Sequence, residues 1–432
     1  HHAFGANSTG GNNTGIGNGA LYANTTANGN TAVGSQALQA NTTGGENGSL
    51  GYASLYSNTT GSNNTGIGYY ALLSNTTANN NTAVGRDALR LNTTGADNVA
   101  VGKHALNAST TGNLNTAVGT DTLSANTTAG ANEAIGYGAL GSNTTGSPNT
   151  AVGCSSLDAN TTGYNNTAIG YESLTENTDG HSNVGVGRST LGANTTGDRN
   201  TAVGVQSLDA NTTAGKNTAV GYQALTANTT GAGNTAMGDT ALATNTTGGG
   251  NVAVGLDAMA ANDTGSSNTA IGQYALTDNT TGAEGTAVGS GALGDNTTGS
   301  YSTAVGVNAA RLNTTGVSLT AIGSYALDAN VTGHYNTAVG SGALSGNTTA
   351  SNNTAVGINA LNANTTSGNN TGIGKNALYV QTTGGYNTAI GSDAGKAITT
   401  GYYNTLAGYD AGSGLTTGYI NTFIGMYAGD NC

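Results

Sequence analysis

A glycine recurs every 17 residues from Gly17 to Gly425, at all 25 positions and without insertion or deletion. The unit around it reads N-T-A-V-G-x-x-A-L-x-x-N-T-T-G-x-x, and we call the residues at one position of the unit a rank. The residue before the glycine is Val or Ile in 22 of 25 copies, and the fourth residue after it is Leu in 20. Seventeen residues with two large apolar side chains cannot bury a core alone, so neighbouring units must stack and share one.

The residue types of the unit favour β-structure. Its commonest residues, Asn, Thr and Gly, are poor helix formers, and it has no apolar stripe of 3.6-residue period. T-A-V-G and x-A-L-x are the predicted strands, and N-T-T-G with the variable pair after it supplies turn residues. We therefore predict an all-β fold, a parallel β-solenoid or β-roll of about 25 coils of 17 residues. Regular coils occupy 1–389, and variant coils occupy 390–432, where Gly395, Gly412 and Gly429 replace the Leu.

Alternation along a strand assigns the two faces of the predicted coil. The Val/Ile and Leu ranks are expected to point inward as the structural core, represented by Val33, Leu38, Val84, Leu89, Ile169 and Leu174. The Ala and Gly ranks beside the Val then face outward, and a surface kept small over 25 coils lets another segment approach closely. The predicted close contact, with a second protomer or with another strand of the same coil, includes Ala32, Gly34, Ala83 and Gly85.

Two Asn ranks flank the predicted strands, one containing Asn13 and Asn30 and the other Asn24 and Asn41. Amides stacked at the coil spacing can bond along the axis as a ladder. The second rank also forms N-x-T sequons, for which glycosylation is the functional alternative. Adjacent Thr ranks, such as the pair at 25–26, offer an ordered hydroxyl array to ice.

Composition and motifs argue against an enzyme. Charged residues make up 7% of the chain, with 9 Lys+Arg against 21 Asp+Glu, and a net charge of −12 disfavours a nucleic-acid partner. The sequence has no run of about 18 apolar residues, so we expect no insertion into a membrane. The usual catalytic, phosphate-binding and calcium-binding motifs do not occur, so we expect no catalytic residue, no cofactor and no metal site.

The tyrosines and cysteines are the remaining candidates for contacts. All 20 Tyr lie in variable ranks, and exposed Tyr is favoured in binding surfaces. The residues of the predicted surface contact, where Tyr density rises towards the C-terminus, are Tyr386, Tyr402, Tyr403, Tyr409, Tyr419 and Tyr427. Cys154 and Cys432 lie about 16 coils apart, too far for a disulfide within one solenoid. Cys432 is therefore the candidate for an intermolecular disulfide.

The motif N-T-A-V-G-x-x-A-L, as at 30–38, resembles the head repeats of trimeric autotransporter adhesins. Those heads are left-handed parallel β-rolls with a related N-S-V-A-I-G motif. The 17-residue form with N-T-T-G is also similar to repeat arrays of phage tail-fibre and bacterial surface-fibre proteins. The resemblance implies a trimeric or fibrous, extracellular, adhesive protein, and it carries over no catalytic residue.

Together these features predict an extracellular or cell-surface fibre protein with a structural and adhesive role. Its partners would be copies of itself, as a trimer or a head-to-tail filament, and host or surface glycans are candidate ligands. The chain starts just after a repeat glycine and stops in mid-coil, which predicts uncapped ends, in a fragment of something larger or in a filament. An ice-binding protein using a Thr rank is the alternative function, and a phage tail-fibre segment is a lesser one.

Overall fold

The computed structural model describes residues 3–430, so the predicted role of Cys432 lies outside the described residues. It contains 25 short strands, and no helix occurs among the described residues. The chain divides into two compact units, residues 1–216 and 217–432, and the variant coils belong to the second. The predicted all-β, parallel β-solenoid with coils of 17 residues is confirmed in each unit.

Each coil contributes one strand. The strands of the first unit are β1 (Thr14–Ile16), β2 (Thr31–Val33), β3 (Gly48–Leu50), β4 (Thr65–Ile67), β5 (Thr82–Val84), β6 (Val99–Val101), β7 (Thr116–Val118), β8 (Glu133–Ile135), β9 (Asn149–Val152), β10 (Asn166–Ile169), β11 (Val184–Val186) and β12 (Thr201–Val203). Those of the second unit are β13 (Thr218–Val220), β14 (Thr235–Met237), β15 (Val252–Val254), β16 (Thr269–Ile271), β17 (Thr286–Val288), β18 (Thr303–Val305), β19 (Thr320–Ile322), β20 (Thr337–Val339), β21 (Thr354–Val356), β22 (Thr371–Ile373), β23 (Thr388–Ile390), β24 (Thr405–Ala407) and β25 (Thr422–Ile424).

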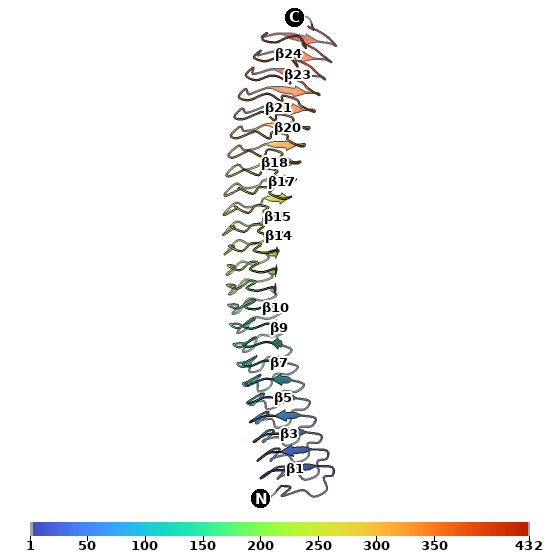
Figure 1. Cartoon of the computed structure of the whole chain (residues 1–432), viewed down its shortest axis with the longest axis vertical. Helices are drawn as coiled ribbons and strands as arrows, with labels where there is room; N and C mark the ends of the chain where they lie inside the picture. The colour runs from blue at the N-terminus through green and yellow to red at the C-terminus, as the bar shows by residue number, and fades with distance from the viewer. Residues whose placement is uncertain (1–2, 431–432) are drawn as a thin grey trace. The chain divides into compact units, whose positions relative to one another are not determined.

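Neighbouring strands within a unit pair in parallel and in register. Ala83 of β5 lies opposite Ala100 of β6, and Ala253 of β15 lies opposite Ala270 of β16, so each residue faces the one 17 positions later. Figure 1 shows the coils of each unit following one another in chain order. Because the register is kept, every rank forms a continuous row along its unit.

The second predicted strand of each coil, x-A-L-x, is wrong: this segment is a turn. Gln36 and Leu38 have φ angles of 62° and 50°, and the same left-handed pattern recurs in the other coils. This conformation costs an L-residue roughly 1–2 kcal/mol, while full burial of a Leu side chain contributes about 1.5–3 kcal/mol. The Leu38 amide also donates to the Ser54 carbonyl of the next coil at 3.0 Å. Burial and inter-coil hydrogen bonds therefore hold the Leu rank in a conformation that Leu alone disfavours.

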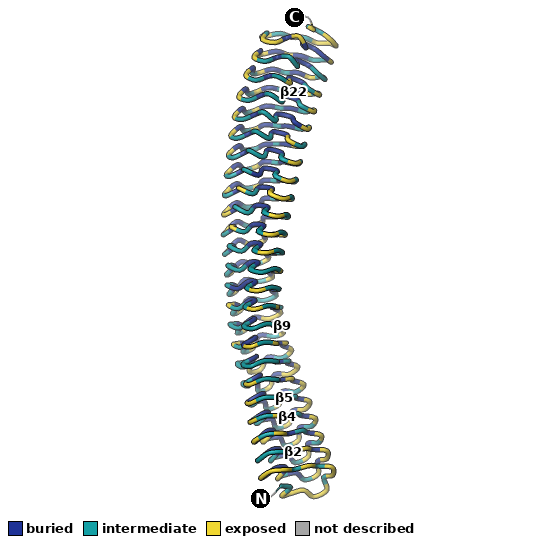
Figure 2. Tube along the Cα trace, viewed as in Figure 1, coloured by how far each residue is buried: buried dark blue, intermediate teal, exposed yellow. Residues whose placement is uncertain are grey.

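The faces of the strand are reversed relative to the prediction. Leu38, Leu89 and Leu174 are fully buried, but Val33 and Val84 are only partly buried, and Ile169 is 40% exposed. The central residue of the strand, most often Ala, points inward instead, and Ala32 and Ala83 are fully buried. Figure 2 shows buried and exposed segments alternating within the coils of each unit. Alternation was predicted correctly, but the assignment of Val33, Val84 and Ile169 to the core is wrong.

The reason is the small cross-section of the coil, which accommodates one bulky rank. A Cβ added to Gly15, at the Ala rank, would lie 2.8 Å from the Phe4 ring at the Leu rank. In a variant coil the large and the small residue change places: Gly395 stands at the Leu rank, and the buried Leu406 stands at the Ala rank. A Cβ on Gly395 would lie 2.6 Å from Leu406. The Leu and Ala ranks thus share one volume, which leaves the Val/Ile rank outside.

Both Asn ranks form the predicted ladders. Asn58 donates from Nδ2 to Asn41 Oδ1 at 2.8 Å and to the Gly61 carbonyl at 2.9 Å. In the other rank, Asn47 Oδ1 accepts the Asn64 backbone amide at 3.0 Å. These side chains are buried at 0–2% exposure. The ladders therefore satisfy polar groups that the narrow interior would otherwise leave without partners.

Candidate functional site

The outward side of the strands forms a regular surface in each unit. We define the strand face as the outer Thr-rank residue and the outer Val/Ile-rank residue of every strand. Ile16, Leu50 and Ile135 of the first unit are 60%, 50% and 46% exposed, and Met237 and Ile390 of the second are 45% and 46% exposed. Each unit therefore carries a row of partly exposed aliphatic side chains at the coil spacing, about 4.8 Å.

The chemistry of the strand face is nearly uncharged. Among the 25 strands, Glu133 is the one charged residue at either outer rank, and Val99, Val184 and Val252 replace Thr there. Eleven spacings of about 4.8 Å give the row of the first unit a length on the order of 50 Å. Monomeric proteins rarely expose contiguous apolar patches beyond a few hundred Å². A row of this length is thus a candidate protein-binding surface.

Of the predicted close contact through Ala32, Gly34, Ala83 and Gly85, the part at Ala32 and Ala83 is wrong as a contact between protomers. Ala32 and Ala83 are fully buried within their own chain, so no partner reaches them. Gly34 has a φ of 138°, and an added Cβ would lie 2.3 Å from the Gly51 carbonyl oxygen. These ranks are small because of packing within the coil and between successive coils, which is the internal alternative raised from the sequence.

The C-terminal tyrosines are exposed, and the structure brings four of the six together. Tyr386 stacks on Tyr403 with ring centroids 4.9 Å apart, and Tyr402 stacks on Tyr419 at 5.3 Å. Tyr402 and Tyr403 meet edge to face at 5.5 Å, and these rings border a hollow of about 470 Å³. The other two, Tyr409 and Tyr427, form a separate edge-to-face pair at 5.5 Å.

A second aromatic cluster lies in the first unit and was missed from the sequence. Tyr52 stacks on Tyr69 at 5.4 Å, and Tyr69 contacts Tyr70 at 4.0 Å. The guanidinium groups of Arg86 and Arg90 lie 5.9 Å and 5.6 Å from the Tyr69 and Tyr70 ring centres. The signal was the recurrence of Tyr one coil apart in the same variable rank.

The sequons and Thr pairs have structural roles. In the sequon rank, the Asn75 amide is buried and donates to Asn58 Oδ1 at 2.8 Å, so a glycan does not fit there in the folded coil. Of the Thr pair, Thr25 donates its hydroxyl to the Thr42 carbonyl at 3.0 Å, whereas Thr26 is exposed. Two ordered rows of hydroxyl groups thus remain available for contacts: the second Thr of each pair, and the Thr of the strand face.

Acidic residues gather at one hollow of the first unit, lined in part by Glu172, Glu176 and Asp209. Burial raises the pKa of Asp209, partly offset by Arg188. Burial also raises the pKa of Asp158, with a smaller contribution from Glu176. No set of three or more metal-ligating side chains with suitable geometry occurs within residues 3–430.

Cys154 is a free, partly buried thiol. No helix long and apolar enough to cross a membrane occurs in the described part of the chain. No known protein family matches the sequence, and comparison with curated proteins finds no significant relative.

Proposed function

We propose that the chain is an extracellular structural and adhesive fibre protein that assembles with copies of itself through the strand face. The observation that carries the proposal is the uninterrupted aliphatic row, partly exposed in each unit and nearly free of charge. A partner that covers this row over many coils needs the same spacing of about 4.8 Å. A second copy of the chain has that spacing, and identical rows can pack against each other around a symmetry axis.

Association would bury the apolar row, while the remaining ranks stay outside. The exposed tyrosines and the variable ranks then lie on the outer surface, where they can contact other molecules. The resemblance of the repeat to adhesin heads and surface fibres supports an extracellular location. The inter-coil ladders of backbone and Asn hydrogen bonds supply the rigidity that a fibre needs.

The assembly is tested by placing charge on three successive coils. We expect Ile135→Lys, Val152→Lys and Ile169→Lys together to weaken self-association at least 100-fold, because association would bury unpaired ammonium groups. These side chains point outward, so the coil itself should remain folded. Sedimentation equilibrium of the full chain measures the effect: the wild type should exceed the monomer mass of 41.8 kDa, and the triple variant should approach it.

The matched control places the same three charges at the same coil spacing on another face. Thr111, Thr128 and Thr145 are exposed in the second Thr rank of three successive coils. Their replacement by Lys should leave the wild-type mass unchanged. A monomeric wild type, or equal dissociation of both triple variants, would contradict assembly through the strand face.

Ice binding is the second candidate, and the two available Thr rows favour it. Thr occupies the first outer position of most strands, repeated in register at the coil spacing. If the strand face binds ice, it must be free, so this function and assembly through the same face exclude each other. Thermal hysteresis and ice-crystal shaping test both rows: ice binding through the strand face requires activity from the monomer, ice binding through the row of the Thr pairs does not, and absence of activity in both the wild type and the strand-face variant removes this candidate.

A further inference from the structure

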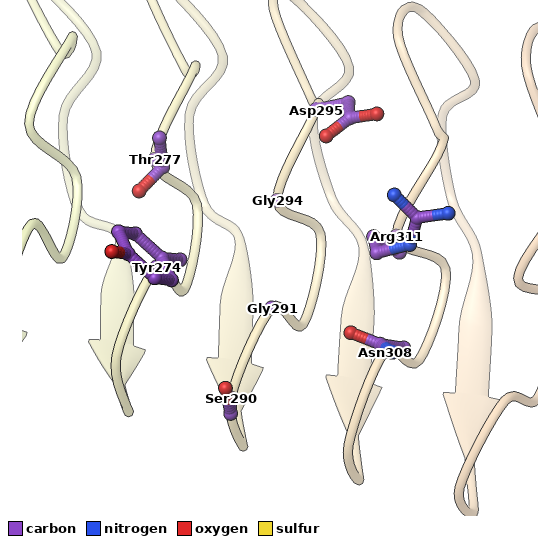
Figure 3. Close-up of a pocket in the computed structure, with 8 residues that line it drawn as sticks. All are labelled: Tyr274, Thr277, Ser290, Gly291, Gly294, Asp295, Asn308 and Arg311. Carbon is purple, nitrogen blue, oxygen red and sulfur yellow. The ribbon is translucent and has the colours of Figure 1, made fainter.

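A hollow of about 270 Å³ opens on the second unit at a coil in which glycine occupies two ranks that have side chains in the neighbouring coils. Gly291 and Gly294 stand there, whereas the preceding coil has Tyr274 and Thr277 in these ranks. The following coil has Asn308 and Arg311. Figure 3 shows the two glycines between the Tyr274 coil and the Arg311 coil, with the Asp295 carboxylate at the rim.

The walls of the hollow differ in chemistry. Tyr274 is 45% exposed and supplies an aromatic side. Ser290, Asp295, Asn308 and Arg311 supply a hydroxyl, a carboxylate, an amide and a guanidinium from two coils. A small number of polar groups converging beside an aromatic ring is typical of small-molecule sites, which usually have volumes of about 300–1,000 Å³. At about 270 Å³ the hollow is slightly smaller than that range, so it suits a small ligand of one ring.

The polar groups are available to a ligand. Within residues 3–430, the side chains of Ser290, Asp295 and Asn308 have no hydrogen-bond partner in the protein. Arg311 Nε lies 3.4 Å from Asp328 Oδ1, but this oxygen is buried and accepts no hydrogen bond. The guanidinium is therefore held in place by charge while its other N–H groups remain free to donate.

Local charge selects among polar ligands. The lining has one carboxylate, Asp295, and one guanidinium, Arg311, and Arg311 also lies beside the Asp328 carboxylate outside the lining, so acidic groups outnumber basic ones there. A carboxylated or phosphorylated ligand would be repelled by the two acids and by the overall charge of −12. An apolar ligand would desolvate the carboxylate, amide and guanidinium without replacing their hydrogen bonds to water.

We propose that this hollow binds one neutral pyranose residue of a glycan. The C–H face of the sugar ring would lie against Tyr274, and its hydroxyls would donate to Asp295 and accept from Arg311 and Asn308. These groups are complementary, since sugar hydroxyls both donate and accept. The inference rests on the adhesive part of the proposed function and needs no assembly through the strand face.

Two single substitutions test the hollow in the full-length chain. Gly294→Thr fills it with the residue that the preceding coil has in that rank, Thr277. The nearest atom to the new Cβ would be the Gly291 carbonyl oxygen at 3.3 Å, so small adjustments accommodate it. Tyr274→Ser removes the aromatic wall and places in that rank a residue type that other coils already have, as at Ser189.

The measurement is saturation-transfer NMR with methyl glucoside, galactoside, mannoside and N-acetylglucosaminide, and with methyl glucuronide as the acidic probe. We expect at least one neutral glycoside to receive saturation on its ring protons, and the glucuronide to receive less. Gly294→Thr and Tyr274→Ser should each weaken that binding at least fivefold. Ala260→Thr and Tyr325→Ser, which change the same two ranks outside the hollow, should leave it unchanged.

Three results would overturn the inference: no transfer to any neutral glycoside, equal binding by the hollow and control variants, or stronger binding of the glucuronide. Sedimentation of the same samples keeps the two proposals apart. If the wild type self-associates and fails to bind any glycoside, the sugar site is wrong while the assembly stands. If it binds a neutral glycoside as a monomer, the assembly is wrong while the sugar site stands.

Discussion

Replacing Gly170 by Ala is expected to destabilise the first unit by about 4 kcal/mol or more. A Cβ at this position would lie 2.3 Å from the carbonyl oxygen of Gly187 on the next coil. Gly170 also has a φ of 137°, outside the regions that L-residues favour. The clash involves backbone on both sides, so no side-chain rotation relieves it.

The stacked architecture determines how the damage appears. Each coil contacts mainly its neighbours, so the stability of a solenoid is close to a sum of coil and interface contributions. A break at Gly170 should therefore loosen the coils on either side before the rest of the unit unfolds. Urea denaturation followed by circular dichroism should give a lower midpoint, and limited proteolysis should cut near this coil first.

Gly48 provides the matched control because it is also a glycine in the first unit and has open space around its Cα. No atom lies within 4 Å of a Cβ built there. Gly48→Ala should change the free energy of unfolding by less than about 1 kcal/mol, in the stabilising direction, since Ala restricts the unfolded chain. Equal midpoints for Gly170→Ala and Gly48→Ala would show that close packing between successive coils does not require glycine at this rank.

Replacing Asn160 by Ala is expected to cost about 3–5 kcal/mol, because several buried polar groups lose partners at once and each costs roughly 1–3 kcal/mol. Its Nδ2 donates to Asn143 Oδ1 at 2.8 Å and to the Gly163 carbonyl at 3.0 Å. Its Oδ1 accepts from Asn177 Nδ2 at 2.9 Å. The substitution therefore interrupts the ladder in both directions and leaves a cavity too.

The free energy of unfolding from urea titration measures this effect, and Thr196→Ala is its control. Thr196 is exposed and has no hydrogen bond from its side chain among the described residues, so its loss should cost less than about 0.5 kcal/mol. A cost below about 1 kcal/mol for Asn160→Ala would contradict a stabilising role for the ladder. Asn160→Asp should be worse than Ala at neutral pH, because it would bury a carboxylate against Asn143 Oδ1.

The variant coils show that the ladder is not the only solution for this interior. Ile398 and Leu415 replace Asn in the sequon rank, and both are buried. They occur in the coils where Gly395 and Gly412 replace the Leu. A Cβ on Gly395 would lie 3.2 Å from Ile398, so the new apolar side chain occupies part of the freed volume. The interior thus tolerates a change of residue type when volume is conserved across ranks.

Much of the candidate site was visible in the sequence, but its location on the coil was not. The exposed tyrosines at 386, 402, 403, 409, 419 and 427 lie in the variable ranks from which they were predicted. The sequence did not predict the strand face, because hydrophobic side chains such as those of Val and Ile are expected to point into the core. The exchange of Gly395 with Leu406 was a signal for the correct assignment, since it pairs the Leu rank with the Ala rank.

The sequence by itself determined the parallel stacking, the coil length, the buried Leu rank and the Asn ladders. An unbroken 17-residue period has few other solutions, because each unit must bury its apolar side chains against an identical neighbour. Only the tertiary structure decided which side of each strand faces inward and that x-A-L-x is a turn. Alternation makes adjacent residues point to opposite sides but does not say which side is inside. The narrow interior decides that, since it holds Leu and Ala together and excludes Val and Ile to the surface.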